Sequence, residues 1–185
     1  MCSSDLFKET NLKGLFIIKP KVHMDSRGYF FESFNQKEFE RNIGTQIHFC
    51  QDNQSKSMKN VLRGLHFQNP SNAQGKLVRV LNGSVLDVAI DIRKNSSTYG
   101  QHFKMTLDNK DFNMLYIPEG FAHGFATLED NTIFSYKCTN FYHKESEDCI
   151  LWNDNDLNID WGIDQPILSE KDQFGKKFSS FVSKF

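Results

Sequence analysis

Short apolar segments, each bounded by turn residues, follow one another through most of the sequence. Segments of this length are typical of β-strands and are too short for independent helices. Many short strands at such spacing predict an all-β fold, either a sandwich or a barrel. We expect strands at 14–18, 29–34, 47–53, 62–68, 77–81, 85–92, 102–107, 114–117, 124–128 and 133–139.

Only a few short helices are expected beside these strands. Asn35 offers an N-cap and is followed three residues later by Glu38, an arrangement that marks the start of a helix. Gly44 provides the stop, so the helix is predicted over 36–42. Beyond about residue 160 the strand pattern weakens, and the segment that begins at Pro166 is expected to be a loop leading into a short helix.

The clearest alternation lies in 85–93, where Leu86, Val88 and Ile90 share one parity and Asp87 has the other. This period of two predicts a strand with two distinct faces. The preceding pair Asn82-Gly83 is a strong signal for a type I′ turn. The sequence therefore predicts a hairpin at this point.

The length of 185 residues suits a single domain, and we expect one domain over 1–185. The net charge of −1 gives no general basic field for nucleic acid or an anionic membrane. No apolar run approaches the roughly 18 residues of a membrane helix, and the N-terminus lacks the pattern of a secretory signal. Four cysteines without CxxC spacing indicate reduced thiols, so a cytoplasmic location is expected.

Residues 60–93 contain several ionisable side chains among apolar, strand-like segments. His66 lies between strand residues, with Arg63 and Lys76 close by in the sequence. One hypothesis is that these residues form the floor of a site in which His66 acts as a base. The alternative is a core histidine hydrogen-bonded to a backbone carbonyl, with both cations at solvated strand ends.

The segment from Pro118 to His123 fits the spacing P-x-G-x-x-H, with Gly120 in the middle. This spacing resembles the second of two motifs that mark cupin-type double-sheet barrels, or jelly rolls. In metal-binding cupins the first motif supplies two further histidines and a glutamate. Here the equivalent region runs from Arg63 to His66 and holds a single histidine. Because a metal needs three or four convergent ligands, we expect the barrel without a metal.

Two further candidates have structural explanations of their own. Tyr136 shares strand parity with Phe134 and Cys138 and would serve as ordinary barrel filling. Asp172 stands three residues after Ser169, which is a capping arrangement. Taken singly, neither residue identifies a function.

The motifs taken together resemble the dTDP-4-dehydrorhamnose 3,5-epimerases, which are cupin-fold enzymes. The resemblance runs in order from about residue 14 to residue 172, and leaves 1–13 and 173–185 unmatched. It rests on DSRGYFFESFN (25–35), QDNQS (51–55), RGLHFQ (63–68), AQGKLVRV (73–80), DVAIDIR (87–93), IPEGFAHGF (117–125), YKCT (136–139), ILWND (150–154) and LSEKD (168–172).

The resemblance implies four catalytic residues. His66 matches the base, and Asp172 matches the carboxylate that orients the imidazole and makes it more basic. Tyr136 matches the acid that returns a proton on the opposite face of the sugar, and Lys76 matches the cation beside the 4-keto oxygen. The implied reaction inverts C3 and C5 of dTDP-4-dehydro-6-deoxy-D-glucose through an enolate, giving dTDP-4-dehydro-L-rhamnose. No cofactor is expected, because removal and return of a proton leave the oxidation state unchanged.

The resemblance also implies residues that bind the substrate and a homodimer with N-terminal strand exchange. In such a dimer, two of these residues, Arg27 and Glu32, would serve the neighbouring subunit's site. Lys171 is expected at the periphery. The remaining substrate-binding candidates are Gln51, Asn53, Arg63, His123 and Glu147.

Other functions stay open at this point. The same base and acid would serve another 4-keto sugar nucleotide, such as a GDP-linked 6-deoxyheptose, or an enzyme that inverts only one carbon. A sugar 3,4-ketoisomerase of the cupin fold would not need His66 and Tyr136 to oppose each other. A sugar-binding cupin without activity would need neither Tyr136 nor Asp172.

Overall fold

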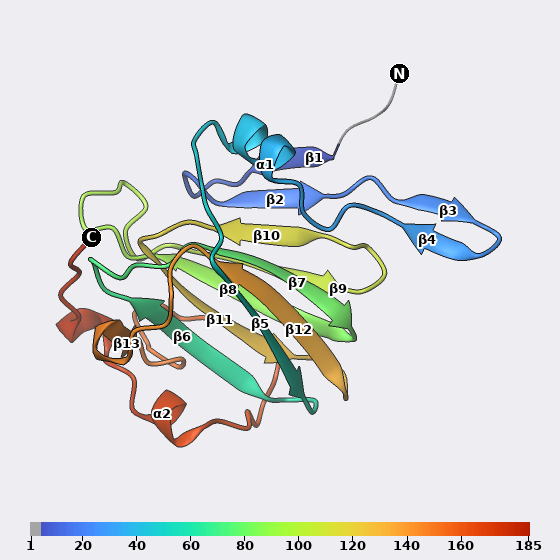
Figure 1. Cartoon of the computed structure of the whole chain (residues 1–185). Coiled ribbons are helices and arrows are strands. Elements are labelled where there is room, and N and C mark those ends of the chain that lie inside the picture. The colour runs from blue at the N-terminus through green and yellow to red at the C-terminus, as the bar shows by residue number, and fades with distance from the viewer. Residues whose placement is uncertain (1–4) are drawn as a thin grey trace.

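Two antiparallel β-sheets face each other in the computed structural model, which describes residues 5–185 (Figure 1). The first sheet contains, in spatial order, β1 (Leu6–Glu9), β2 (Phe16–Lys19), β10 (Met114–Ile117), β7 (Lys76–Asn82), β12 (Thr132–Cys138) and β5 (Gln51–Ser57). The second contains β13 (Glu147–Cys149), β6 (Leu62–Gln68), β11 (Phe121–Thr127), β8 (Ser84–Asp91) and β9 (His102–Asp108). The predicted all-β, double-sheet barrel is therefore confirmed.

The remaining elements are small. A separate hairpin of β3 (His23–Asp25) and β4 (Gly28–Phe30) extends away from the barrel in Figure 1. The α-helices are α1 (Gln36–Ile43) and α2 (Glu170–Gln173), and two 3₁₀ turns cover Lys144–Ser146 and Phe178–Ser180. No helix in the described residues is long and apolar enough to cross a membrane.

The predicted first helix is confirmed with the expected N-cap and C-cap residues, and it ends at Ile43, one residue later than predicted. The Asn35 side chain accepts the backbone N–H groups of Lys37 and Glu38, and Gly44 ends the helix in the left-handed region with φ +80°. Phe39 is the buried residue of the helix and packs edge-on against Tyr116 of β10. The helix therefore covers the outer face of the first sheet.

The predicted hairpin at Asn82-Gly83 is wrong. β7 and β8 meet at this turn but belong to different sheets, so the chain crosses from one sheet to the other. Gly83 has φ +79°, and a Cβ there would lie 2.5 Å from the Thr132 hydroxyl oxygen. The glycine is thus required by a close crossing of the barrel edge, and its turn signal carried no information about which strands pair.

Some strand boundaries also differ from the prediction. β5 begins at Gln51 instead of residue 47, because its ladder partner β12 ends opposite Gln51, at Cys138. β4 ends at Phe30 and pairs only with β3, so the aromatic run beyond it is irregular. β1, β3 and β13 were not expected from the pattern.

The two predicted faces of β8 are confirmed, and both are buried. Val85 and Ala89 face the core between the sheets, which Leu12 and Leu15 complete from the loop between β1 and β2. The side chains of opposite parity, including Val88, form a second apolar core on the outer face of the second sheet, under the C-terminal segment. These outer-core residues are Leu62, Ile90, Ile92, Ile150, Leu157, Trp161 and Phe181.

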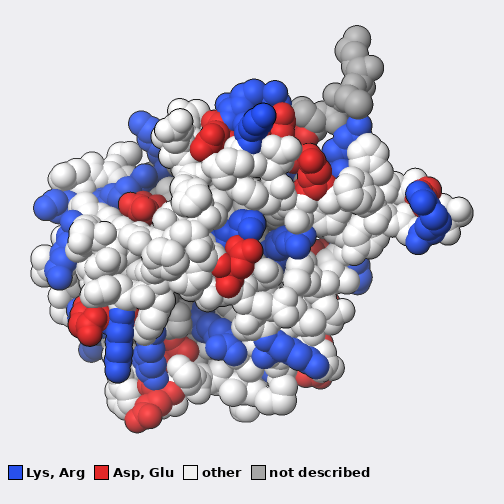
Figure 2. Space-filling view, in the orientation of Figure 1, with Lys and Arg blue, Asp and Glu red and all other residues white. Residues whose placement is uncertain are grey.

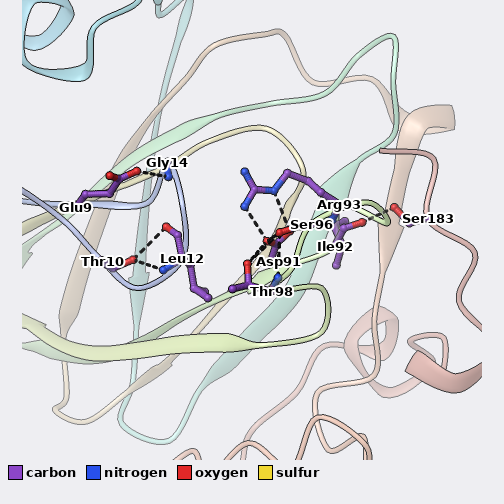
Figure 3. Close-up of polar contacts among 10 residues, drawn as sticks. All are labelled: Glu9, Thr10, Leu12, Gly14, Asp91, Ile92, Arg93, Ser96, Thr98 and Ser183. Atoms are coloured by element: carbon purple, nitrogen blue, oxygen red, sulfur yellow. Dashed lines mark hydrogen bonds and ion pairs between the residues drawn. The ribbon is translucent and has the colours of Figure 1, made fainter.

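A cluster of hydrogen bonds centred on Asp91 fixes the loop after β8 at one end of the barrel (Figure 3). The Asp91 carboxylate accepts hydrogen bonds from the Ser96 and Thr98 hydroxyls, each at 2.6 Å, and from the Arg93 guanidinium. Burial alone would raise the pKa of Asp91, but these donors lower it to about 2. The Ser183 hydroxyl donates to the Ile92 carbonyl and so ties the end of the chain to the same loop.

Candidate active site

A cavity of about 440 Å³ opens between the two sheets. It contains eight of the residues predicted for the site, contributed by both sheets. Further wall residues that the sequence did not single out include Gln68, Gln74, Phe134 and Tyr142. The predicted residues in its wall are Gln51, Asn53, Arg63, His66, Lys76, His123, Tyr136 and Glu147.

The cationic side chains available to a ligand lie in the cavity wall itself. In the part of the chain that the structure describes, Lys and Arg side chains are interspersed with Asp and Glu over the face shown in Figure 2. Arg63 and Lys76 both line the cavity. An anionic ligand would therefore be attracted by these two side chains and not by a general basic surface.

Asp172 lies behind His66 and is not part of the cavity wall. The His66 Nε2 atom is 2.5 Å from Asp172 Oδ1, and Asp172 is only 2% exposed. Burial alone would raise the pKa of Asp172, but hydrogen bonds from His66, Ser169 and the Gly64 N–H lower it below its ordinary value. The ionised carboxylate must accept the bond, so Nε2 carries the proton and Nδ1 is left as the ring atom able to take one.

A second histidine–carboxylate pair lies beside the first. His123 on β11 is the cross-strand neighbour of His66 on β6. Its Nε2 atom lies 2.9 Å from a carboxylate oxygen of Asp87, which is completely buried. Sequence reasoning missed Asp87. The available signal was its parity, because a carboxylate on the inner face of a strand needs a partner.

Tyr136 and Lys76 belong to the first sheet, whereas His66 belongs to the second. The base candidate and the acid candidate thus line one cavity from different sheets. Burial raises the pKa of Tyr136, so its phenol stays protonated at neutral pH. Burial also lowers the pKa of Lys76, although the nearby Cys138, Glu147 and Asp87 oppose this change.

Glu147 connects the cavity to Lys171. Its carboxylate accepts the Tyr142 hydroxyl at 3.0 Å and forms an ion pair with Lys171. Burial alone would raise the pKa of Glu147, but these two partners lower it. Lys171 lies outside the cavity wall, yet it holds one of the wall residues in place.

Arg27 and Glu32 are not brought to this cavity. The Arg27 side chain is 88% exposed on the β3–β4 hairpin and pairs with Asp25 at 2.6 Å. Glu32 accepts a hydrogen bond from the Asn35 side chain at 3.2 Å. Within one chain, neither residue takes part in the site.

Among the described residues, one group has potential metal-ligand atoms close together: His66, Cys149 and Asp172. Its donors are already engaged, because His66 and Asp172 are bonded to each other and the Cys149 thiol contacts the Ile150 carbonyl at 3.4 Å. Burial raises the pKa of Cys149 to about 12, so the thiol stays protonated at neutral pH. In this structure all three side chains are therefore engaged in hydrogen bonds within the protein. Cys50 and Cys138 are also free thiols, and Cys2 lies outside the described residues.

Comparison with solved structures gives close matches. The chain superimposes with a TM-score of 0.93 on a dTDP-6-deoxy-D-glucose-3,5-epimerase from Legionella pneumophila in complex with dTDP-4-keto-L-rhamnose, at 45% identity over 96% of this chain and 95% of that one. A more distant structure, a 3′-monoepimerase from Streptomyces bikiniensis in complex with dTDP-quinovose, gives a TM-score of 0.88 at 28% identity. That match covers 92% of this chain and 87% of the other.

Sequence comparison agrees. The family model described as dTDP-4-dehydrorhamnose 3,5-epimerase matches residues 9–180. The dTDP-4-dehydrorhamnose 3,5-epimerase of Shigella flexneri is 52% identical over 170 residues, which cover 92% of this chain and 94% of the relative. The chain therefore belongs to the dTDP-4-dehydrorhamnose 3,5-epimerase family.

Proposed function

We propose that this protein inverts both C3 and C5 of dTDP-4-dehydro-6-deoxy-D-glucose and forms dTDP-4-dehydro-L-rhamnose. The observation that carries the proposal is the position of His66 and Tyr136, which line one cavity from different sheets. Inversion needs a base on one face of the sugar and an acid on the other, and a single residue cannot supply both. The product-bound relative from Legionella pneumophila supports the same substrate class.

The first step removes a proton next to the ketone. The C4 carbonyl acidifies the hydrogens on C3 and C5, because the electron pair of the broken C–H bond moves into an enolate. His66 accepts the proton at Nδ1, while its Nε2–H stays bonded to Asp172. Lys76 in its protonated form would stabilise the negative O4, and one such donor is worth roughly 3–4 kcal/mol in comparable sites.

The second step returns a proton to the opposite face. Tyr136 donates its phenolic proton to C5. Because the pKa of Tyr136 is raised, the phenol carries this proton throughout the neutral pH range. Water would donate to C3. The sugar keeps its oxidation state, and for this reason we infer that the enzyme needs no cofactor.

The other wall residues would hold the substrate. The Arg63 guanidinium suits a diphosphate because its donors match phosphate oxygens in pairs. His123, Gln51, Asn53 and Glu147 offer hydrogen bonds to the sugar and nucleotide. Lys171 would act through Glu147, its ion-pair partner.

We also propose that the active enzyme is a homodimer in which an N-terminal segment crosses to the partner subunit. β1 and β2 pair within the chain, so we assign the crossing to the β3–β4 hairpin. Tyr29 and Phe30 on this hairpin are 58% and 69% exposed, which is unusual for large aromatic side chains. Arg27 and Glu32 would then reach the partner's active site and complete its binding site for the nucleotide. The free thiols favour a reducing compartment, and we keep the cytoplasm as the proposed location.

Proton NMR in D₂O tests the proposed reaction with the purified protein and dTDP-4-dehydro-6-deoxy-D-glucose. Deuterium at both C3 and C5 is the expected result. Deuterium at one carbon would reduce the function to that of a monoepimerase, the activity named for the more distant structural neighbour. A GDP-linked 4-keto sugar run in parallel tests the nucleotide preference, and no exchange with either substrate would contradict an epimerase function.

A further inference from the structure

We propose that Ser169 and Gly175 are positioning residues that hold the Asp172 carboxylate against His66. This inference rests on the proposed function, which makes His66 the base. Neither residue lines the cavity, and their effect would pass entirely through Asp172.

Residues 168–175 form a strap that is fastened to the second sheet on both sides of Asp172. Before the strap, Ile167 forms a parallel bridge with Val61, next to the start of β6. After the strap, Lys176 forms a parallel bridge with Ile150, directly after β13. Backbone hydrogen bonds of 2.7–3.0 Å secure both bridges, namely Ile167 N–H to Asn60 O, Leu62 N–H to Ile167 O, Leu151 N–H to Lys176 O and Lys176 N–H to Cys149 O.

β13 and β6 are neighbours in the sheet, and Cys149 lies opposite His66. The strap is therefore fastened to the strand that carries the base and to the strand next to it. Such an anchorage keeps the distance between Asp172 and His66 fixed as long as the strap keeps its shape. The shape of the strap then depends on its own residues.

Ser169 controls the orientation of the carboxylate. Its hydroxyl donates to Asp172 Oδ2 at 2.7 Å and accepts the Asp172 backbone N–H at 3.3 Å. The other oxygen, Oδ1, is bonded to His66. Because each oxygen has its own partner, rotation of the carboxylate is blocked in both directions. Ser169 is also the N-cap of α2, a helix of only four residues.

Gly175 allows the far end of the strap to lie flush on the sheet. A Cβ at this position would be 2.5 Å from the Leu151 nitrogen and 2.6 Å from the Ile150 carbonyl carbon. Both are backbone atoms next to β13, so they cannot swing aside as a side chain would. A methyl group would push the strap outward and lengthen the contact between Asp172 and His66.

The test uses Ser169→Ala, Ser169→Thr and Gly175→Ala in the full chain. The matched control is Ser180→Ala, which removes an exposed hydroxyl that donates to the Lys177 carbonyl. We expect Ser169→Ala to lower kcat about tenfold or more, with KM changed less than about twofold, since the substrate contacts are untouched. Ser169→Thr keeps the hydroxyl and should restore most of kcat. Gly175→Ala should resemble Ser169→Ala or be more severe.

A second readout does not depend on turnover. Long-range ¹H–¹⁵N spectra of the imidazole rings, with His66 assigned by its loss in His66→Asn, report which ring nitrogen is protonated. We expect Nε2–H in the wild type and a shifted, averaged signal in Ser169→Ala. Circular dichroism melting checks that each variant is folded, and the serine variants carry the test if Gly175→Ala fails to fold.

Two results would overturn the inference. One is a Ser169→Ala enzyme with the kcat and His66 signals of the Ser180→Ala control. The other is a Ser169→Thr variant as impaired as Ser169→Ala, which would mean that the hydroxyl is not what matters. A wild-type protein without exchange on any sugar would instead refute the proposed function, while the imidazole spectra would still decide the positioning of Asp172.

Discussion

The imidazole of His66 and the carboxylate of Asp172 share a hydrogen bond of 2.5 Å, although 106 positions separate them in the sequence. One residue lines the cavity and the other is buried behind it. This division lets the carboxylate stay ionised and oriented while only the imidazole meets a ligand. The proposed reaction depends on this pair more than on any other contact in the molecule.

Tyr136→Phe should separate the two inversions. The phenylalanine keeps the ring in the cavity wall but cannot donate a proton, so inversion at C5 should fall at least 100-fold, the usual range for a lost general acid. Exchange at C3 should change much less, because water serves that carbon. Proton NMR in D₂O measures both rates in one sample, with Tyr99→Phe, on the loop between β8 and β9, as the control. Equal losses at both carbons would contradict the assigned role.

Lys76→Met should lower kcat roughly 100-fold at both carbons, because the developing O4 charge would lose its cation. Methionine has a similar length, so the cavity should keep its shape. The exposed Lys56 on β5 offers a matched control, Lys56→Met. Steady-state kinetics would contradict this role if KM rose while kcat stayed at the wild-type value, since that outcome indicates ground-state binding alone.

Asp91→Asn should destabilise the fold without touching the cavity. The pKa of Asp91 is about 2 in the folded chain against an ordinary 3.8, and the residue is completely buried. A depressed pKa stabilises the fold above pH 4, and the contribution disappears as the pH falls through 2. It corresponds to roughly 2 kcal/mol near neutral pH.

Urea unfolding at pH 7 and at pH 2.5 measures this contribution for the wild type, for Asp91→Asn and for the exposed control Asp156→Asn. We expect a clear deficit for Asp91→Asn at pH 7 and a smaller one at pH 2.5. A deficit that is independent of pH would show that the carboxylate charge is not what stabilises the loop.

Mixing two inactive variants tests the proposed subunit crossing. If Arg27 serves the partner's site, a dimer of one Arg27→Ala chain and one His66→Asn chain contains one complete site. Equal amounts of the two variants, unfolded and refolded together, should recover roughly a quarter of wild-type activity. Each variant refolded alone is the control. Recovery no greater than the sum of the two controls would place Arg27 outside the partner's site.

The sequence predicted those parts of the structure that local patterns determine. Asn35, Glu38 and Gly44 gave the first helix correctly, and the alternation around Val88 gave both faces of β8. The Asn82-Gly83 turn misled because turn residues report the local backbone, whereas the choice of sheet depends on packing across the barrel. β13 was missed because a strand of three residues has too little periodicity to detect.

The candidate site shows the same limit. The family motifs named eight residues that the fold brings to one cavity, which no spacing rule would have done. Asp87 and Tyr142 escaped notice because their importance comes from their partners, His123 and Glu147, on other elements. Pairings between distant segments become visible only when both segments have been placed in space.

Deuterium exchange catalysed by His66→Asn tests the central claim most directly. Asparagine retains a polar side chain but cannot act as a base near neutral pH. His102→Asn, on β9 and outside the cavity wall, is the matched control. The substrate is dTDP-4-dehydro-6-deoxy-D-glucose in D₂O, and dTDP binding by calorimetry verifies that the site is intact. We predict loss of exchange at C3 and at C5 together, with dTDP binding and the control unaffected. Exchange at either carbon at the wild-type rate would contradict the assignment of His66 as the base.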